Sequence, residues 1–132
     1  MNRKALSLAG FAASLFALPA LAHHSFAMFD ATKTLTLTGT VKEMEWTNPH
    51  AWIHMIVPDA SGKPIEYALE MQGTGQSVKL GWTPDSVKPG DKITAEIRPL
   101  KTGGHGGQLM SVVLPSGQKL GVTGKPASPF GE

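Results

Sequence analysis

The sequence predicts an all-β fold, a five-stranded OB-type barrel with a short helix between the third and fourth strands. Five segments alternate apolar and polar residues with the period of two that half-buried strands show. A stretch without this rhythm separates the third segment from the fourth. Gly39 interrupts the first segment, as in a strand that bends at a barrel corner. A small β-sandwich is the alternative architecture.

The first two predicted strands are joined by a short turn. The first spans residues 33–46, where threonines alternate with leucine and valine and β-branched side chains are frequent. Residues 47–49 have turn chemistry, and the second strand spans residues 51–57. Its core-facing side chains are predicted to be those of Ala51, Ile53, Met55 and Val57.

A hairpin loop at residues 58–64 leads to the third predicted strand at residues 65–71. Glu66 and Glu70 are expected on the solvated face of this strand. The residues expected on its core face are Tyr67, Leu69 and Met71. Strand alternation then breaks at residues 73–82, which predicts the short helix.

The last two predicted strands follow a Lys-Pro-Gly-Asp turn at residues 88–91. The fourth spans residues 92–98, where apolar residues alternate cleanly. A glycine-rich stretch at residues 103–107 is expected to be a flexible loop, and the fifth strand spans residues 108–114. The Gly- and Pro-rich tail at residues 123–132 is expected to be loose.

The first 22 residues predict a cleavable secretory signal. A basic start precedes an apolar run at residues 5–18, which is shorter than the roughly 20 residues needed to span a bilayer. Ala20 and Ala22 place small residues at the two positions that signal peptidase requires, so cleavage is expected after Ala22. The mature protein would then begin at His23 in the periplasm without a membrane anchor; an uncleaved interfacial anchor is the alternative.

Composition limits the partners of the mature chain, expected to be one β-barrel domain at residues 23–122. Loss of Arg3 and Lys4 lowers the Lys and Arg count from 12 by two, to equal the 10 Asp and Glu. A neutral domain lacks the positive surface that supplies most non-specific nucleic-acid affinity, so no nucleic-acid partner is expected. Because there is no cysteine, neither disulfides nor a lipid-bearing cysteine can stabilise or anchor the protein.

Four short motifs are spread along the mature chain. They are His23-His24-Ser25-Phe26, the W-T-N-P-H-A-W run at residues 46–52, Gly81-Trp82-Thr83 and Lys88-Pro89-Gly90-Asp91. Together they resemble a family of small exported bacterial proteins that is known only as a domain of unknown function. The resemblance covers nearly all of the mature chain and implies a periplasmic β-barrel domain, but it carries no established activity and no catalytic residues.

The five histidines predict a metal site. An N-terminal His23 would offer its α-amine and its imidazole to one ion, and copper(II) prefers such nitrogen ligands. The imidazole of His50 would complete a T-shaped site similar to the histidine brace of exported copper proteins. His24, His54 and His105 are reserve ligands. On a straight strand His50 and His54 would lie roughly 13 Å apart, too far to share one ion.

The alternative is an interaction module that binds no metal. The histidines would then be a solvated chain end and an exposed strand face. Trp52, with Asn48 in the preceding turn, would contact a small ligand or a partner protein on that strand face. The glycine-rich loop at residues 103–107 is a second surface for such an interaction module. Trp46 and Trp82 are expected to plug the core or the barrel ends.

Enzymatic activity is not expected. There is no G-x-S-x-G motif and no cysteine nucleophile. Glu66 and Glu70 share a strand face but would lie roughly 13 Å apart, beyond the span of glycosidase carboxylate pairs. Residues 73–77 lack the third glycine of a dinucleotide fingerprint and the Lys-Ser/Thr of a P-loop. Apart from copper, no cofactor is predicted.

Overall fold

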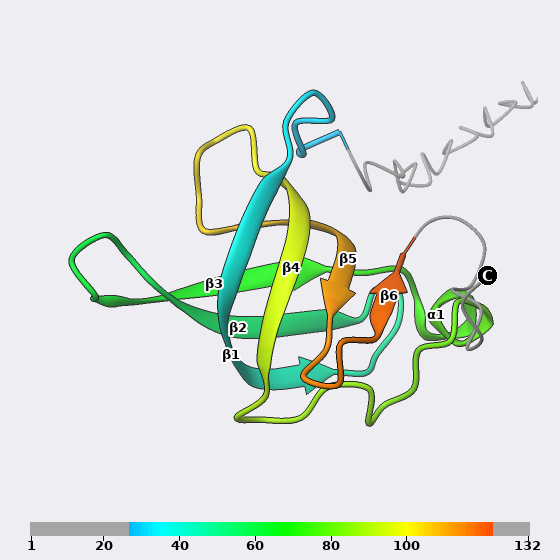
Figure 1. Ribbon diagram of the computed structural model, residues 1–132. Coiled ribbons are helices and arrows are strands. Elements are labelled where there is room, and N and C mark those ends of the chain that lie inside the picture. Colours follow the sequence, from blue (N-terminus) through cyan, green and yellow to red (C-terminus); the bar gives the residue numbers. More distant parts are fainter. Residues whose placement is uncertain (1–26, 123–132) are drawn as a thin grey trace, which may run out of the picture.

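A computed structural model describes residues 27–122, in which five strands close a β-barrel and a sixth short strand pairs with β5 alone (Figure 1). The strands are β1 (Leu35–Glu45), β2 (Trp52–Pro58), β3 (Pro64–Glu70), β4 (Lys92–Pro99), β5 (Gly106–Val113) and β6 (Lys119–Gly121). A single short helix, α1 (Thr74–Lys79), lies between β3 and β4. The all-β barrel predicted from the sequence is therefore confirmed. The predicted signal, His23, His24 and the tail at residues 123–132 lie outside the described residues.

Barrel closure depends on one long strand and one parallel pairing. The strand order is β3-β2-β1-β4-β5-β6, and β3 also pairs with β5 to complete the ring. That closing pair is parallel, whereas all other pairs of strands are antiparallel. The first half of β1 pairs with β4 and its second half with β2, so β1 bends between two partners (Figure 1).

Gly39 lies where β1 passes from one partner to the other. A Cβ atom there would collide with the carbonyl oxygen of Ile56 on β2, so only glycine permits this close approach. The β1–β2 register shifts slightly later, between Val41 and Glu43, which makes Lys42 the extra residue of a bulge. The bend predicted at Gly39 is therefore present. The bulge lies three residues later in the chain, at Lys42.

The inner face of the barrel is a continuous apolar core. Of the predicted core residues, Ala51 directly before β2 and Ile53 and Met55 on β2 are fully buried. Trp82, only 1% exposed, fills the core next to α1, as expected of a plug. Trp46 is half-buried and packs against the same core. The two-residue period thus correctly identified which face of β2 turns inward.

Helix α1 is shorter than the predicted stretch at residues 73–82. Its last residue is Lys79, and Gly81 follows with a positive φ of 92°, a conformation that ends helices after the C-cap.

Within the described residues, no helix has both the length and the apolar character needed to cross a membrane.

Two predictions near the closing strand pair were wrong. Gly106 and Gly107 are not part of a flexible loop but are buried at the start of β5. An added Cβ at Gly107 would collide with the carbonyl oxygen of Arg98, so glycine is needed for the strands to meet. Glu70 is not solvated but only 5% exposed, because closure places it between Trp52 and Gln108 on neighbouring strands.

The third difference is an element that the sequence did not predict. Strand β6 has three residues and pairs with β5 through Leu120, which is buried opposite Val112. Such a short segment contains too few alternations to be distinguished from a loop.

Candidate functional site

His50 is held at the end of the loop that precedes β2. Its Nδ1 lies 2.8 Å from the carbonyl oxygen of Met71 and 3.3 Å from Glu70 Oε1, and the side chain is 23% exposed. A carbonyl oxygen can only accept, so Nδ1 is the donor of this hydrogen bond. The neutral ring therefore carries its lone pair on Nε2, the nitrogen through which it can bind a metal.

Two polar side chains are buried beside each other next to His50. Burial raises the pKa of the Glu70 carboxyl, and the nearby His50 partly opposes this shift. Gln108 is the cross-strand neighbour of Glu70 and is likewise 5% exposed. Its buried Oε1 has no hydrogen-bond partner among the residues that the structure describes. Where β3 meets β5, the outer face of the barrel therefore carries polar side chains that are buried from solvent.

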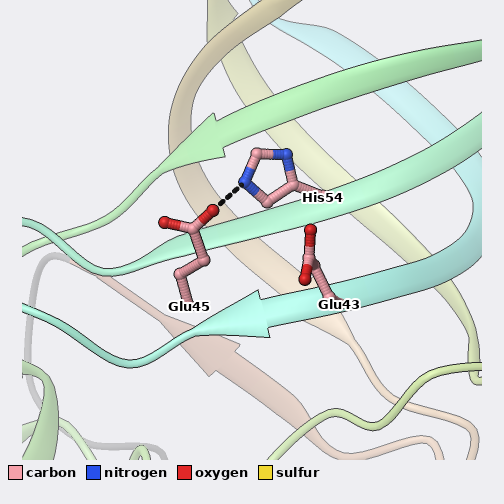
Figure 2. A group of neighbouring side chains, drawn as sticks. All are labelled: Glu43, Glu45 and His54. Atoms are coloured by element: carbon pink, nitrogen blue, oxygen red, sulfur yellow. Dashed lines mark hydrogen bonds and ion pairs between the residues drawn. The ribbon is translucent and has the colours of Figure 1, made fainter.

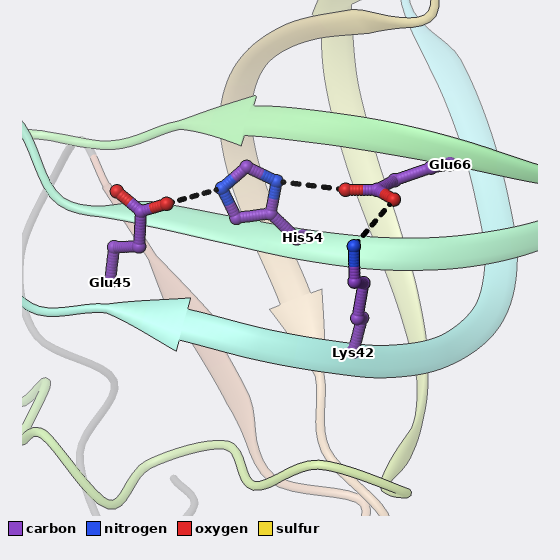
Figure 3. A network of polar contacts seen from close by, with 4 residues as sticks. All are labelled: Lys42, Glu45, His54 and Glu66. Atoms are coloured by element: carbon purple, nitrogen blue, oxygen red, sulfur yellow. Dashed lines mark hydrogen bonds and ion pairs between the residues drawn. The ribbon is translucent and has the colours of Figure 1, made fainter.

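His54 lies on the outer face of β2 and bridges two carboxylates. Its Nε2 is 3.0 Å from Glu45 Oε1, and its Nδ1 is 3.4 Å from Glu66 Oε1 (Figure 3). The other oxygen of Glu66 accepts a hydrogen bond of 2.8 Å from Lys42 Nζ. This hydrogen bond is the main reason why the pKa of Glu66 is lowered. The four side chains form a continuous line of polar contacts across β1, β2 and β3.

Glu43 joins this line from β1. It is the cross-strand partner of His54, and Glu45 lies two residues further along the same face. The candidate ligand atoms of Glu43, Glu45 and His54 all lie within 4.8 Å of one another (Figure 2). Within residues 27–122, no other group of three His, Cys, Asp or Glu side chains meets in this way.

His105 lies apart from this cluster, in the exposed loop before β5. Its ring packs at 45° against Tyr67, with 5.2 Å between ring centroids. In the described part of the chain, no group of three candidate ligands contains two histidines. The structure thus brings neither His50 nor His105 into one ligand group with His54. His23 and His24, the other predicted ligands, are not among the described residues.

The two predicted ligand-contacting residues have different surroundings. Trp52 is half-buried on the outer face of β2, between Glu45 and Glu70 on the flanking strands. Asn48 instead connects its loop to α1: its Oδ1 accepts the backbone N–H of Thr74 at 2.9 Å, and its Nδ2 donates to Thr74 Oγ1 at 2.9 Å. The amide of Asn48 is therefore used within the fold, and its ligand role stays a prediction.

Sequence reasoning did not identify the carboxylates around His54. Glu43 and Glu45 are two residues apart on a strand, the spacing at which side chains share a face. Their approach to His54 follows from the β1–β2 register and its shift at Lys42. The two-residue spacing of Glu43 and Glu45 was therefore a usable signal in the sequence. The pairing of their strand with the strand that carries His54 could not be read from it.

The fold and this cluster together define a small β-barrel domain with histidine and carboxylate side chains gathered on its outer face. The chain belongs to the family of unknown function DUF6152, whose model matches residues 12–110. This match confirms the resemblance to an uncharacterised domain family. No curated protein and no solved structure matches the chain.

Proposed function

We propose that the mature protein is a periplasmic binding domain that holds one copper(II) ion through the amine and imidazole of His23 and the imidazole of His50. The observation that carries this proposal is the orientation of His50. Its Nδ1 donates to the Met71 carbonyl at 2.8 Å, which leaves Nε2 as the basic nitrogen. Imidazoles that bind metals are generally fixed in this way by a carbonyl or carboxylate on the other nitrogen.

The surroundings of His50 support the same assignment. The Glu70 carboxylate lies 3.3 Å from Nδ1 and, when ionised, makes the ring a better electron donor. The ring is only 23% exposed, so its orientation is set by packing as well as by hydrogen bonding. His23 would bring two further nitrogen ligands, and copper(II) favours such nitrogen-rich tetragonal sites.

A metal-free interaction module is the second candidate function. A pocket of about 300 Å³ adjoins the β2–β3 hairpin and is lined in part by Thr40, Ile56 and Lys92. Ile56 and Trp52 project from the same outer face of β2, four residues apart. The pocket therefore lies further along the strand face that carries Trp52. Its concave apolar surface and the ammonium group of Lys92 would suit a small anionic ligand.

Copper(II) titration of processed protein that begins at His23 tests the first proposal. The comparison is the same protein with its N-terminal amine acetylated, which converts the His23 amine into an amide. We expect acetylation and His50→Gln each to weaken copper binding by about tenfold or more. His105→Gln is the matched control, because this ring packs on Tyr67 in an exposed loop. Equal binding by the free and the acetylated forms would overturn the proposal.

A further inference from the structure

We propose that Glu43, Glu45 and His54 form a binding site for a divalent cation of the zinc class on the outer face of the barrel. This site is separate from the copper site and does not depend on His23 or His50. It uses ligands from two adjacent strands, with both carboxylates on β1 and the imidazole on β2. The three side chains converge on one point above the sheet (Figure 2).

The distances suit one shared ion. Zinc bonds of about 2.1 Å in tetrahedral geometry place ligand atoms about 3.4 Å apart. His54 Nε2 and Glu45 Oε1 are already 3.0 Å apart, and all three ligand atoms lie within 4.8 Å of one another. Glu43 and Glu45 are exposed, so small side-chain rotations can close the remaining gap without moving the strands. Paired β-strands hold the three Cα positions in place.

The second nitrogen of His54 provides an independent observation. Nδ1 faces Glu66 Oε1 at 3.4 Å, while Nε2 faces the cluster. Glu66 is itself held by Lys42, whose ammonium donates to Oε2 at 2.8 Å (Figure 3). A histidine with a carboxylate on one nitrogen and the metal on the other is the usual arrangement in zinc sites. Glu66 and Lys42 are thus positioning residues that orient the ring.

The ligand set selects the class of ion. An ionised carboxylate can only accept, so in the metal-free fold His54 Nε2 donates to Glu45, and the metal would take the place of that proton. The two carboxylates and the neutral imidazole then carry a charge of −2, which a divalent cation neutralises. Calcium and magnesium favour all-oxygen sites, whereas zinc accepts imidazole and carboxylate together. Three protein ligands leave a fourth position for water or for a group from a bound partner. Because two ligands are exposed, the ion would be reachable from solvent at this fourth position.

Zinc titration followed by calorimetry and by histidine-ring NMR tests the proposal. The protein is the mature chain with an acetylated N-terminus, so that the proposed copper site does not compete. We expect one zinc ion per chain and a change in the His54 ring resonances. His54→Gln and the double change Glu43→Gln with Glu45→Gln should each weaken binding by about tenfold or more.

Matched controls separate this site from the rest of the surface. His105→Gln removes another imidazole, and His50→Gln removes the copper ligand; both should leave zinc affinity unchanged. Asp85→Asn removes an exposed carboxylate outside the cluster and should have no effect. Zinc binding that survives both cluster variants, or a zinc-induced change at other histidines alone, would overturn the proposal. If His54→Gln disturbs folding, the double glutamate variant still decides the question, because its side chains are exposed.

Discussion

The indole Nε1 of Trp82 donates a hydrogen bond of 2.7 Å to the carbonyl oxygen of Gly121. This contact joins the turn after α1 to β6, the strand that pairs with β5 alone. Trp82 is 1% exposed, so its indole is anchored both by apolar packing and by this single polar contact. The short strand β6 therefore depends on a side chain 39 residues earlier in the chain.

Replacement of Trp82 by phenylalanine should destabilise the protein by about 2 kcal/mol, because the Gly121 carbonyl loses its buried donor. Urea unfolding followed by far-UV circular dichroism measures this loss. Trp46→Phe is the control, since Trp46 is only half-buried at the rim of the core. Equal unfolding free energies for the two variants would contradict the assigned role of the indole hydrogen bond.

The sequence predicted the five longer strands and missed the short strand whose position depends on a distant contact. Strand β2 repeats its pattern over seven residues, with Ile53 and Met55 buried, so its period is visible locally. Strand β6 has three residues and is placed by Trp82 and by pairing with β5. Burial of Glu70 was missed for the same reason, because only barrel closure brings Gln108 beside it.

The candidate site was likewise only partly predictable from the sequence. His54 could be selected as a ligand from its residue type, but its neighbours could not. Glu43 faces it only because the β1–β2 register includes a shift at Lys42. A slip of one residue in that register would move Glu43 to the opposite face of the sheet. Which carboxylates surround His54 is therefore set by strand pairing, which local patterns do not specify.

Gly39→Ala should destabilise the barrel strongly, whereas Gly75→Ala should not. A Cβ at Gly39 would collide with the Ile56 carbonyl and force β1 and β2 apart. At Gly75 in α1 an added Cβ meets nothing within 4 Å, and alanine favours the helix by about 0.5–1 kcal/mol. Thermal unfolding should show a lowered midpoint for the first variant and an unchanged or raised midpoint for the second. A Gly39→Ala protein as stable as Gly75→Ala would contradict the close approach of the strands.

Asn48→Ala should cost about 1 kcal/mol, because α1 loses the side-chain acceptor of its first N–H group. In the structure this acceptor is Asn48 Oδ1, at 2.9 Å from the Thr74 nitrogen. Asn48→Asp keeps an acceptor oxygen and should cost less. Denaturant unfolding of the two variants provides the comparison. If both lose the same free energy, the acceptor is not what stabilises the helix start.

The carboxylate of Glu96 should make stability depend on pH through its contact with Ser111. Ser111 Oγ donates a hydrogen bond of 2.6 Å to Glu96 Oε2, and Lys119 Nζ lies 3.4 Å from the same oxygen. These contacts, with the serine first, lower the pKa of Glu96 below its ordinary value of 4.5. The folded state thus favours the ionised form, so its stabilising effect is fully present above the ordinary pKa and is lost as pH falls through the lowered pKa.

Ser111→Ala should therefore raise the pKa of Glu96 toward its ordinary value and reduce the acid-sensitive part of the stability. The difference in unfolding free energy between wild type and Ser111→Ala should be larger at neutral pH than at about pH 3. NMR titration of the Glu96 carboxyl and urea unfolding at both pH values measure these effects. Ser77→Ala is the control, because Ser77 Oγ bonds a backbone carbonyl, that of Gln72, at 3.3 Å. Its cost should be the same at both pH values, and a matching pH-independent cost for Ser111→Ala would show that the hydrogen bond to Glu96 does not set the pKa.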